Sequence, residues 1–172
     1  MAGLRSFSCY RKPKKRPYTR KSKYKARAFI RSVPNIKIVK FDLGDLKREF
    51  AAQVDLVSKE NIQIRHNAIE SARQVVIRRL GETNKPYHFK IRVYPHNILR
   101  ENKMLTGAGA DRMQTGMQRS FGRAISSAAI LKPKQPIFSV YIDKDAVDAV
   151  KLALKAAFSK MPGRCGVVVV KK

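Results

Sequence analysis

The chain has 172 residues, of which 38 are Lys or Arg and only 12 are Asp or Glu, giving a formal net charge of +26 at pH 7. Hydrophobic residues make up 44% of the chain, which is enough for a folded core and excludes a wholly disordered protein. A globule with this charge excess repels itself, so the sequence predicts a polyanionic partner. Nucleic acid is the expected partner, because each phosphate that a Lys or Arg neutralises releases a condensed counterion.

Membrane and oxidising environments are disfavoured by the sequence. The longest apolar run, residues 166–170, is far shorter than the roughly 20 residues that cross a bilayer, and the N-terminus lacks the apolar stretch of a signal peptide. Cys9 and Cys165 are far apart and carry no paired spacing, so we expect no disulfide framework. These features predict a cytoplasmic protein with no membrane partner.

The first 41 residues contain fourteen basic residues and no acidic ones, with aromatic residues between them. Such a segment cannot form a core of its own and is either a solvated, disordered tail or an RNA-binding extension. The regular spacing of the aromatics favours the second reading, because rings stack on unpaired bases while Arg and Lys hold phosphates. We therefore assign residues 1–34 to a basic RNA-binding extension. Its candidate contacts are Arg11, Lys12, Lys14, Lys15, Arg16, Tyr18, Arg20, Lys21, Lys23, Arg27 and Arg31.

A single folded domain is expected over residues 35–172. Its first elements are predicted as strands at residues 36–41 and 50–58, with a turn at residues 42–45. A helix is predicted over residues 65–80, because apolar residues recur there at helical spacing. Its buried stripe comprises Ile69, Ala72, Val76 and Leu80.

Gly81 is expected to end this helix as its left-handed residue. The polar face of the helix carries Arg73, Arg78 and Arg79, which form either a solvated face or further phosphate contacts. We include Arg73 among the candidate RNA-binding residues.

Residues 87–94 give the clearest strand pattern in the chain. Apolar residues alternate there with His88, Lys90 and Arg92, and Pro95 ends the strand. We include Lys90 and Arg92 among the candidate RNA contacts.

The C-terminal part predicts a strand at residues 137–142, a helix capped by Asp143, and a buried strand at residues 165–170. That helix carries its apolar residues on one side and Lys151 and Lys155 on the other. Strands together with two helices, without regular βαβ alternation, predict an α+β fold.

Residues from about 98 to 132 show little core-forming pattern and are expected to protrude as a long loop. Glycines recur in its middle, with Lys and Arg between them. Glycine lets a backbone approach a bulky ligand closely, and the arginine fork suits phosphate. The loop is therefore expected to order against RNA.

Catalytic and metal-binding patterns are not visible in the sequence. His66, His88 and His96 have no ligand spacing with one another or with the cysteines, and a zinc site needs four converging ligands. The carboxylates are dispersed, and no glycine-rich phosphate loop with its Lys and Ser or Thr is present. We expect no metal, no cofactor and no enzymatic activity.

A family resemblance rests chiefly on residues 102–112, which read NKMLTGAGADR, followed by QTGM at 114–117 and FG at 121–122. This run closely resembles the long loop of ribosomal protein family sixteen of the large subunit, called ten-e in its archaeal and eukaryotic branch. Supporting matches cover nearly the whole chain in order. They include CYR at 9–11, PY at 17–18, FDLG at 41–44, IRV at 91–93 and PGR at 162–164.

The resemblance implies an α/β-hammerhead-like mixed sheet and a place on large-subunit rRNA near the tRNA path. Family members help to position aminoacyl- and peptidyl-tRNA close to the peptidyl transferase centre. The implied partners are large-subunit rRNA, tRNA and neighbouring ribosomal proteins in the cytoplasmic ribosome, and not a second copy of the chain. The loop residues implied to point towards tRNA are Lys103, Arg112, Gln114, Arg119 and Arg123.

Two details refine the resemblance. The chain ends at Lys172, without the C-terminal extension of eukaryotic members, which makes it similar to the archaeal type. Residues 124–131 depart from the family pattern, which usually has a turn with Gly and Pro followed by basic residues.

Two other functions remain open at the level of sequence. A DNA-compacting or RNA-chaperoning protein shares the charge but has no use for a long loop rich in Gly and Arg. An RNA-processing enzyme predicts an acid–base pair or a nucleophile, and the sequence shows neither.

Overall fold

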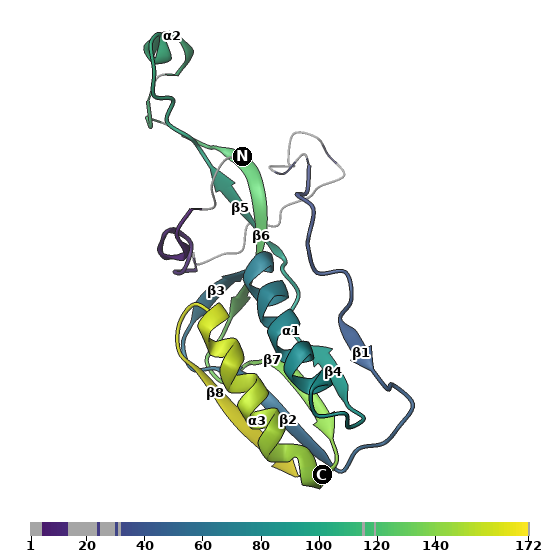
Figure 1. Ribbon diagram of the computed structural model, residues 1–172. Coiled ribbons are helices and arrows are strands. Elements are labelled where there is room, and N and C mark those ends of the chain that lie inside the picture. The colour runs from purple at the N-terminus through teal and green to yellow at the C-terminus, as the bar shows by residue number, and fades with distance from the viewer. Residues whose placement is uncertain are drawn as a thin grey trace.

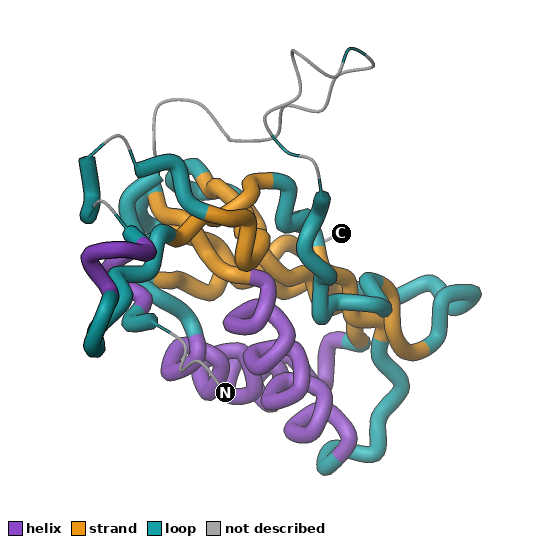
Figure 2. Tube along the Cα trace, turned by 90° about the horizontal axis from the view of Figure 1, so that it is seen from above, coloured by secondary structure: helices purple, strands orange, loops and turns teal. Residues whose placement is uncertain are grey.

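The computed structural model describes residues 5–13, 24, 30, 32–114, 116–118 and 120–171. The body has two layers, in which α1 (His66–Gly81) and α3 (Val147–Ala156) pack against a five-stranded sheet (Figure 1). Seen from above, both helices lie on the same side of the strands (Figure 2). A second sheet of three strands leads away from the body into a long projection.

The five-stranded sheet is antiparallel throughout, with the order β1-β4-β7-β2-β8. The expectation of a mixed sheet is therefore wrong. Strand β7 precedes helix α3 in the chain and strand β8 follows it. These two strands point in the same direction but are not neighbours in the sheet, because β2 lies between them and pairs antiparallel with both. The strands are β1 (Asp42–Gly44), β4 (His88–Ile91), β7 (Pro136–Ile142), β2 (Ala52–Ser58) and β8 (Cys165–Lys171).

The three-stranded sheet has the order β3-β6-β5 and consists of β3 (Ile62–Arg65), β6 (Arg123–Leu131) and β5 (Asn97–Glu101). It replaces both arms of the loop that was expected over residues 98–132. The returning arm was not predicted because residues 126–129 read SSAA, and the outgoing arm because residues 97–101 read NILRE; neither alternates polar and apolar residues as a strand does. Only residues 102–122 extend beyond the ladder, and they include the short helix α2 (Ala110–Met113).

The core between the helices and the five-stranded sheet follows the predicted patterns. The α1 stripe of Ile69, Ala72, Val76 and Leu80 is buried as predicted, and Phe89 of β4 packs against Phe138 of β7 at 5.1 Å between ring centroids. Burying a side chain of this size contributes about 1.5–3 kcal/mol. Strands 50–58, 87–94 and 137–142 are confirmed as β2, β4 and β7, although β4 is shorter than expected.

Two predictions near the N-terminal side of the body are wrong. Residues 36–41 pair with no strand of the described chain, although Ile38 is buried and the Phe41 carbonyl accepts a hydrogen bond from Ile91 N–H at 2.8 Å. Pairing with β4 begins one residue later, at Asp42. The residues predicted as a turn at 42–45 therefore form β1 instead. Gly44 makes this possible, because its φ of 93° lets the chain turn directly beside Tyr87.

The ends of the two helices also differ from prediction. Gly81 is the last residue of α1, and the left-handed residue is Asn84, with φ 49°. Asp143 precedes a 3-10 turn, η3 (Lys144–Ala146), but its carboxylate accepts a hydrogen bond from Arg48 at 2.7 Å instead of capping the helix.

Strand β8 was expected to be buried, and it lies at the edge of the sheet. Cys165 is buried, whereas Val168, Val169 and Val170 are exposed. An edge strand has a neighbour on one side only, which leaves its outer side chains in solvent.

Gly44→Ala should lower the free energy of unfolding by about 2 kcal/mol or more, because a left-handed backbone costs a residue with Cβ about 1–2 kcal/mol. The added Cβ would also overlap the Tyr87 carbonyl. Gly81→Ala is the matched control, since its Cβ meets nothing within 4 Å. That substitution should raise stability by about 0.4–1 kcal/mol. Urea unfolding measures both, and equal effects would contradict the assigned backbone.

Candidate nucleic-acid interface

The candidate RNA-binding residues of the N-terminal extension fall into two groups. Arg11 and Lys12 are described by the structure, and the side chain of Lys12 is exposed. The remaining nine lie outside the described residues, namely Lys14, Lys15, Arg16, Tyr18, Arg20, Lys21, Lys23, Arg27 and Arg31.

Residues 10 and 11 are attached to the edge of the three-stranded sheet. Gln63 of β3 donates its backbone N–H to the Arg11 carbonyl at 2.9 Å and its side-chain Nε2 to the Tyr10 carbonyl at 2.8 Å. The buried Asn97 side chain donates in turn to Gln63 Oε1. This long-range attachment of the extension was not predicted from the sequence.

Two carboxylates hold the same segment electrostatically. Arg5 pairs with Glu101 of β5, and Arg11 pairs with Glu60 at 2.6 Å. The hydrogen bond from Arg11 lowers the pKa of the Glu60 carboxyl, and the nearby Arg164 charge adds to this effect. Arg11, which was predicted to contact RNA, therefore also has a structural partner within the protein.

Gln63→Leu should lower the free energy of unfolding by about 1–3 kcal/mol, because it removes the partner of buried or half-buried polar groups at Tyr10 and Asn97. The matched control is Gln74→Leu on the exposed face of α1, which should change stability by less than about 0.5 kcal/mol. Urea unfolding followed by circular dichroism measures the difference. Equal stability of the two variants would show that Gln63 does not hold the extension.

Among the body residues predicted to bind RNA, Arg73 is the most enclosed. Its guanidinium donates to Glu70, with Nε 2.8 Å from Oε2, and its side chain is 19% exposed. This hydrogen bond lowers the pKa of Glu70 and raises that of Arg73. An RNA phosphate would have to compete with Glu70 for this side chain.

Lys90 and Arg92 alternate along the chain with the buried Phe89, Ile91 and Val93. Lys90 Nζ lies 3.3 Å from Asp42 Oδ1, and Arg92 is exposed while its backbone N–H donates to the Ile137 carbonyl. His88 beside them lies 3.3 Å from the same carboxylate and stacks on Tyr141 at 5.1 Å. Residues 88–92 therefore form a basic surface with one carboxylate.

The projecting loop, residues 102–122, places Lys103 and Arg112 in solvent, and Arg123 is exposed where β6 begins. Figure 1 shows α2 at the far end of this projection. Arg119 lies outside the described residues.

Gln114, which the resemblance implies to point towards tRNA, also makes two hydrogen bonds within the loop. Its Nε2 donates to the Lys103 carbonyl at 2.8 Å, and its Oε1 accepts from Leu105 N–H at 2.8 Å. These two bonds join the outgoing and returning arms of the loop. Both ends of the Gln114 amide are thus occupied within the protein, which makes it a positioning residue of the loop.

Sequence reading also missed the apolar side chains of the loop. The large apolar side chains of this loop are about half exposed or more. Exposed apolar side chains that gather on one part of a protein surface indicate a contact surface. They are Met104, Leu105, Met113, Met117 and Phe121. The signal in the sequence was the placement of these residues in a segment with no helical or strand period.

The histidines and cysteines of the described chain gather in no cluster of three or more potential metal ligands. His66 is buried and its Nδ1 accepts a hydrogen bond from Lys37 N–H at 3.1 Å. In the same described ranges, no helix combines the length and apolar character needed to cross a bilayer.

The charge excess cannot be neutralised within the chain. Even if each of the 12 acidic residues paired with one Lys or Arg, 26 of the 38 basic residues would keep an unbalanced charge. The described ion pairs already occupy six of the acidic residues: Asp42, Glu60, Glu70, Glu101, Asp143 and Asp148. The remaining positive charge needs an external polyanion.

Comparison with known proteins places the chain among proteins of the ribosome, which agrees with the expected polyanionic partner. A family model described as ribosomal protein L16p/L10e matches residues 13–168. The chain is 44% identical over 172 residues to the large ribosomal subunit protein uL16 of Methanococcus maripaludis strain C7, covering 98% of this chain and 95% of that protein. It is 42% identical over 164 residues to the protein of the same name from Methanosphaerula palustris, covering 93% and 90%. The chain therefore belongs to the L16p/L10e family of ribosomal proteins, and it is of the archaeal type.

Proposed function

We propose that the protein is a structural constituent of the large ribosomal subunit that binds large-subunit rRNA near the tRNA path. In this role it works in the cytoplasmic ribosome, beside neighbouring ribosomal proteins, and helps to position aminoacyl- and peptidyl-tRNA close to the peptidyl transferase centre. The observation that carries the proposal is the unbalanced charge of +26 on a chain of this family.

The distribution of basic residues supports rRNA as the main partner. The extension attaches to β3 through residues 10 and 11, so the basic residues that follow start from a fixed point on the body. Exposed Lys12, Arg92 and Arg123 lie on separate elements, which suits a partner that wraps several faces of the protein. Folded RNA presents phosphates over such an extended surface.

The projecting loop supports a second contact, with tRNA. The loop extends far from the body and is fixed internally by Gln114, so it can reach a ligand that the body does not touch (Figure 1). Its exposed Met104 and Met113 suit packing against bases or ribose, and Lys103 and Arg112 suit phosphates. The α/β-hammerhead architecture implied by the resemblance remains part of this proposal.

Large subunits that lack their own copy of this protein provide the test. The purified chain should co-sediment with them through a wash in moderate salt and restore peptide-bond formation. Duplex DNA in equal phosphate concentration should compete poorly with the rRNA. Loss of the chain in the wash, or preferential binding to DNA, would contradict the proposed function.

A further inference from the structure

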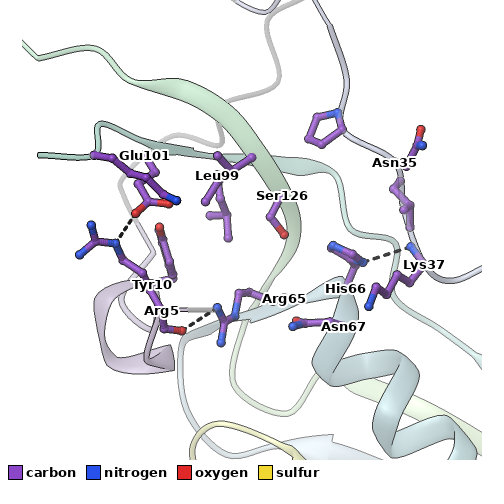
Figure 3. Close-up of a pocket in the computed structure, with 14 residues that line it drawn as sticks. Arg5, Tyr10, Asn35, Lys37, Arg65, His66, Asn67, Leu99, Glu101 and Ser126 are labelled. Carbon is purple, nitrogen blue, oxygen red and sulfur yellow. Dashed lines mark hydrogen bonds and ion pairs between the residues drawn. The ribbon is translucent and has the colours of Figure 1, made fainter. Parts of the chain in front are cut away.

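A pocket of about 500 Å³ lies where the N-terminal segment, the start of α1 and the base of the β5–β6 ribbon meet (Figure 3). This volume falls within the range of about 300–1,000 Å³ that is typical of small-ligand sites. Its lining residues come from five separate segments, within residues 5–10, 34–37, 65–67, 99–103 and 125–126, so they are brought together only by the fold. Leu99, Ile125 and Tyr10 supply apolar and aromatic surface within it.

One polar side chain of this pocket can bind a ligand directly, and it is His66. Asn67 also lines the pocket, but its Oδ1 is enclosed, with almost no accessible surface and no hydrogen bond to a described residue. His66 uses Nδ1 to accept the hydrogen bond from Lys37 N–H, so the neutral ring carries its proton on Nε2. Burial lowers the pKa of His66, and the charges of Lys37 and Arg65 lower it further, which keeps the ring neutral at physiological pH. The pocket thus offers one free donor, the Nε2–H of His66.

The rim of the pocket is positively charged. Lys37, Arg65 and Lys103 line it, and its one carboxylate, Glu101, is already paired with Arg5. Neither Lys37 nor Lys103 forms an ion pair with a described residue, and Arg65 uses one nitrogen on the Arg5 carbonyl at 2.9 Å. A ligand with a negative group at the mouth and an uncharged, planar body inside fits this arrangement.

We propose that this pocket receives one unstacked nucleotide of large-subunit rRNA, with its base inside and its phosphate on the rim of Lys37, Arg65 and Lys103; this rests on the proposed function. Every base carries hydrogen-bond acceptors on its edge, which matches the free Nε2–H of His66. Tyr10 and Leu99 supply surface against which the base packs. A base within a duplex cannot enter a pocket, so the occupant comes from a bulge, loop or junction.

Chemical probing of the rRNA in the assembled complex tests this assignment. The full chain is bound to large-subunit rRNA, and the base edges are probed with dimethyl sulfate for adenine and cytosine and with a carbodiimide for guanine and uracil. Asn67→Leu and Ser126→Leu fill the pocket without removing a hydrogen bond of the described chain. Gln74→Leu, an amide on the exposed face of the same helix, is the matched control.

The wild-type chain and Gln74→Leu should protect the same unpaired base, and both pocket variants should lose that protection by roughly tenfold. The remaining footprint and its salt dependence should stay unchanged. Identical protection with all four proteins would overturn the proposal. A uniform loss over the whole footprint would overturn it too, because a pocket for one nucleotide affects one position.

Two outcomes separate this inference from the proposed function and from a free ligand. If the wild-type chain gives no footprint on large-subunit rRNA, the proposed function itself fails. The second outcome uses free AMP at millimolar concentration, with the Asn67 side-chain amide followed by NMR. If AMP shifts this amide resonance and no rRNA base is protected, the pocket binds a free nucleotide and the rRNA assignment is overturned.

Discussion

Replacing residues 102–122 by a two-residue Asn-Gly turn should leave the fold intact and still permit docking on rRNA, with only the Lys103 contact at the pocket rim lost, but should slow peptide-bond formation by large subunits at least tenfold. Glu101 and Arg123 are register partners at the end of the β5–β6 ladder, so a two-residue turn can join them. No described residue of the loop belongs to the buried core. A tenfold loss corresponds to about 1.4 kcal/mol in the activation barrier.

Three measurements are needed for this loop variant. Urea unfolding should match that of the wild-type chain, co-sedimentation with large subunits should persist, and single-turnover peptide transfer should be slow. A control variant with Lys103→Gln and Arg112→Gln keeps the loop length but removes two positive charges. It therefore distinguishes the effect of losing charge from the effect of shortening the loop. Unfolding of the shortened protein would instead show that the loop is part of the core, and unchanged peptide transfer would remove it from the tRNA path.

Neutralising Lys12, Lys14, Lys15 and Arg16 to Gln should weaken association with large-subunit rRNA by on the order of a hundredfold at ~0.15 M salt. If each of these residues neutralises one phosphate, the slope of log affinity against log salt becomes shallower by about three units. The fold should persist, because the attachment through Gln63 involves the backbone of residues 10 and 11.

The control for this variant keeps the charge and changes the side chains. Lys12, Lys14 and Lys15 are changed to Arg, and Arg16 to Lys, so that a charge-driven contact should keep its salt slope. Filter binding over a salt series measures both proteins. An unchanged slope after neutralisation would mean that these four residues face solvent in the complex.

Regular elements with a clear period were predictable from the sequence. The stripe of Ile69, Val76 and Leu80 and the alternation around Phe89 reflect burial on one face, which is a local property of the chain. Strands β5 and β6 were not predictable in this way. The central residues of β6, such as Ser127 and Ala128, are small and are buried by pairing with β3 and β5, and the five residues of β5 have two adjacent apolar residues, Ile98 and Leu99, instead of an alternating pattern.

The candidate site was only partly predictable for a related reason. Exposed basic residues such as Lys12 and Lys103 are recognised by charge alone, but partners distant in sequence cannot be read from it. Arg73 faces Glu70, Arg11 faces Glu60, and Gln114 joins the arms of its own loop. The pocket with Asn67 likewise depends on five segments that only the folded chain brings together.

The salt dependence of binding between the purified wild-type chain and large-subunit rRNA tests the electrostatic account most directly. With at least six phosphate contacts, the association constant should fall about a thousandfold or more between ~50 mM and ~200 mM salt. Subunits lacking their own copy should bind the chain in dilute buffer and release it as salt rises. Binding that does not respond to salt, or no binding even in dilute buffer, would contradict the conclusion that rRNA phosphates neutralise this protein.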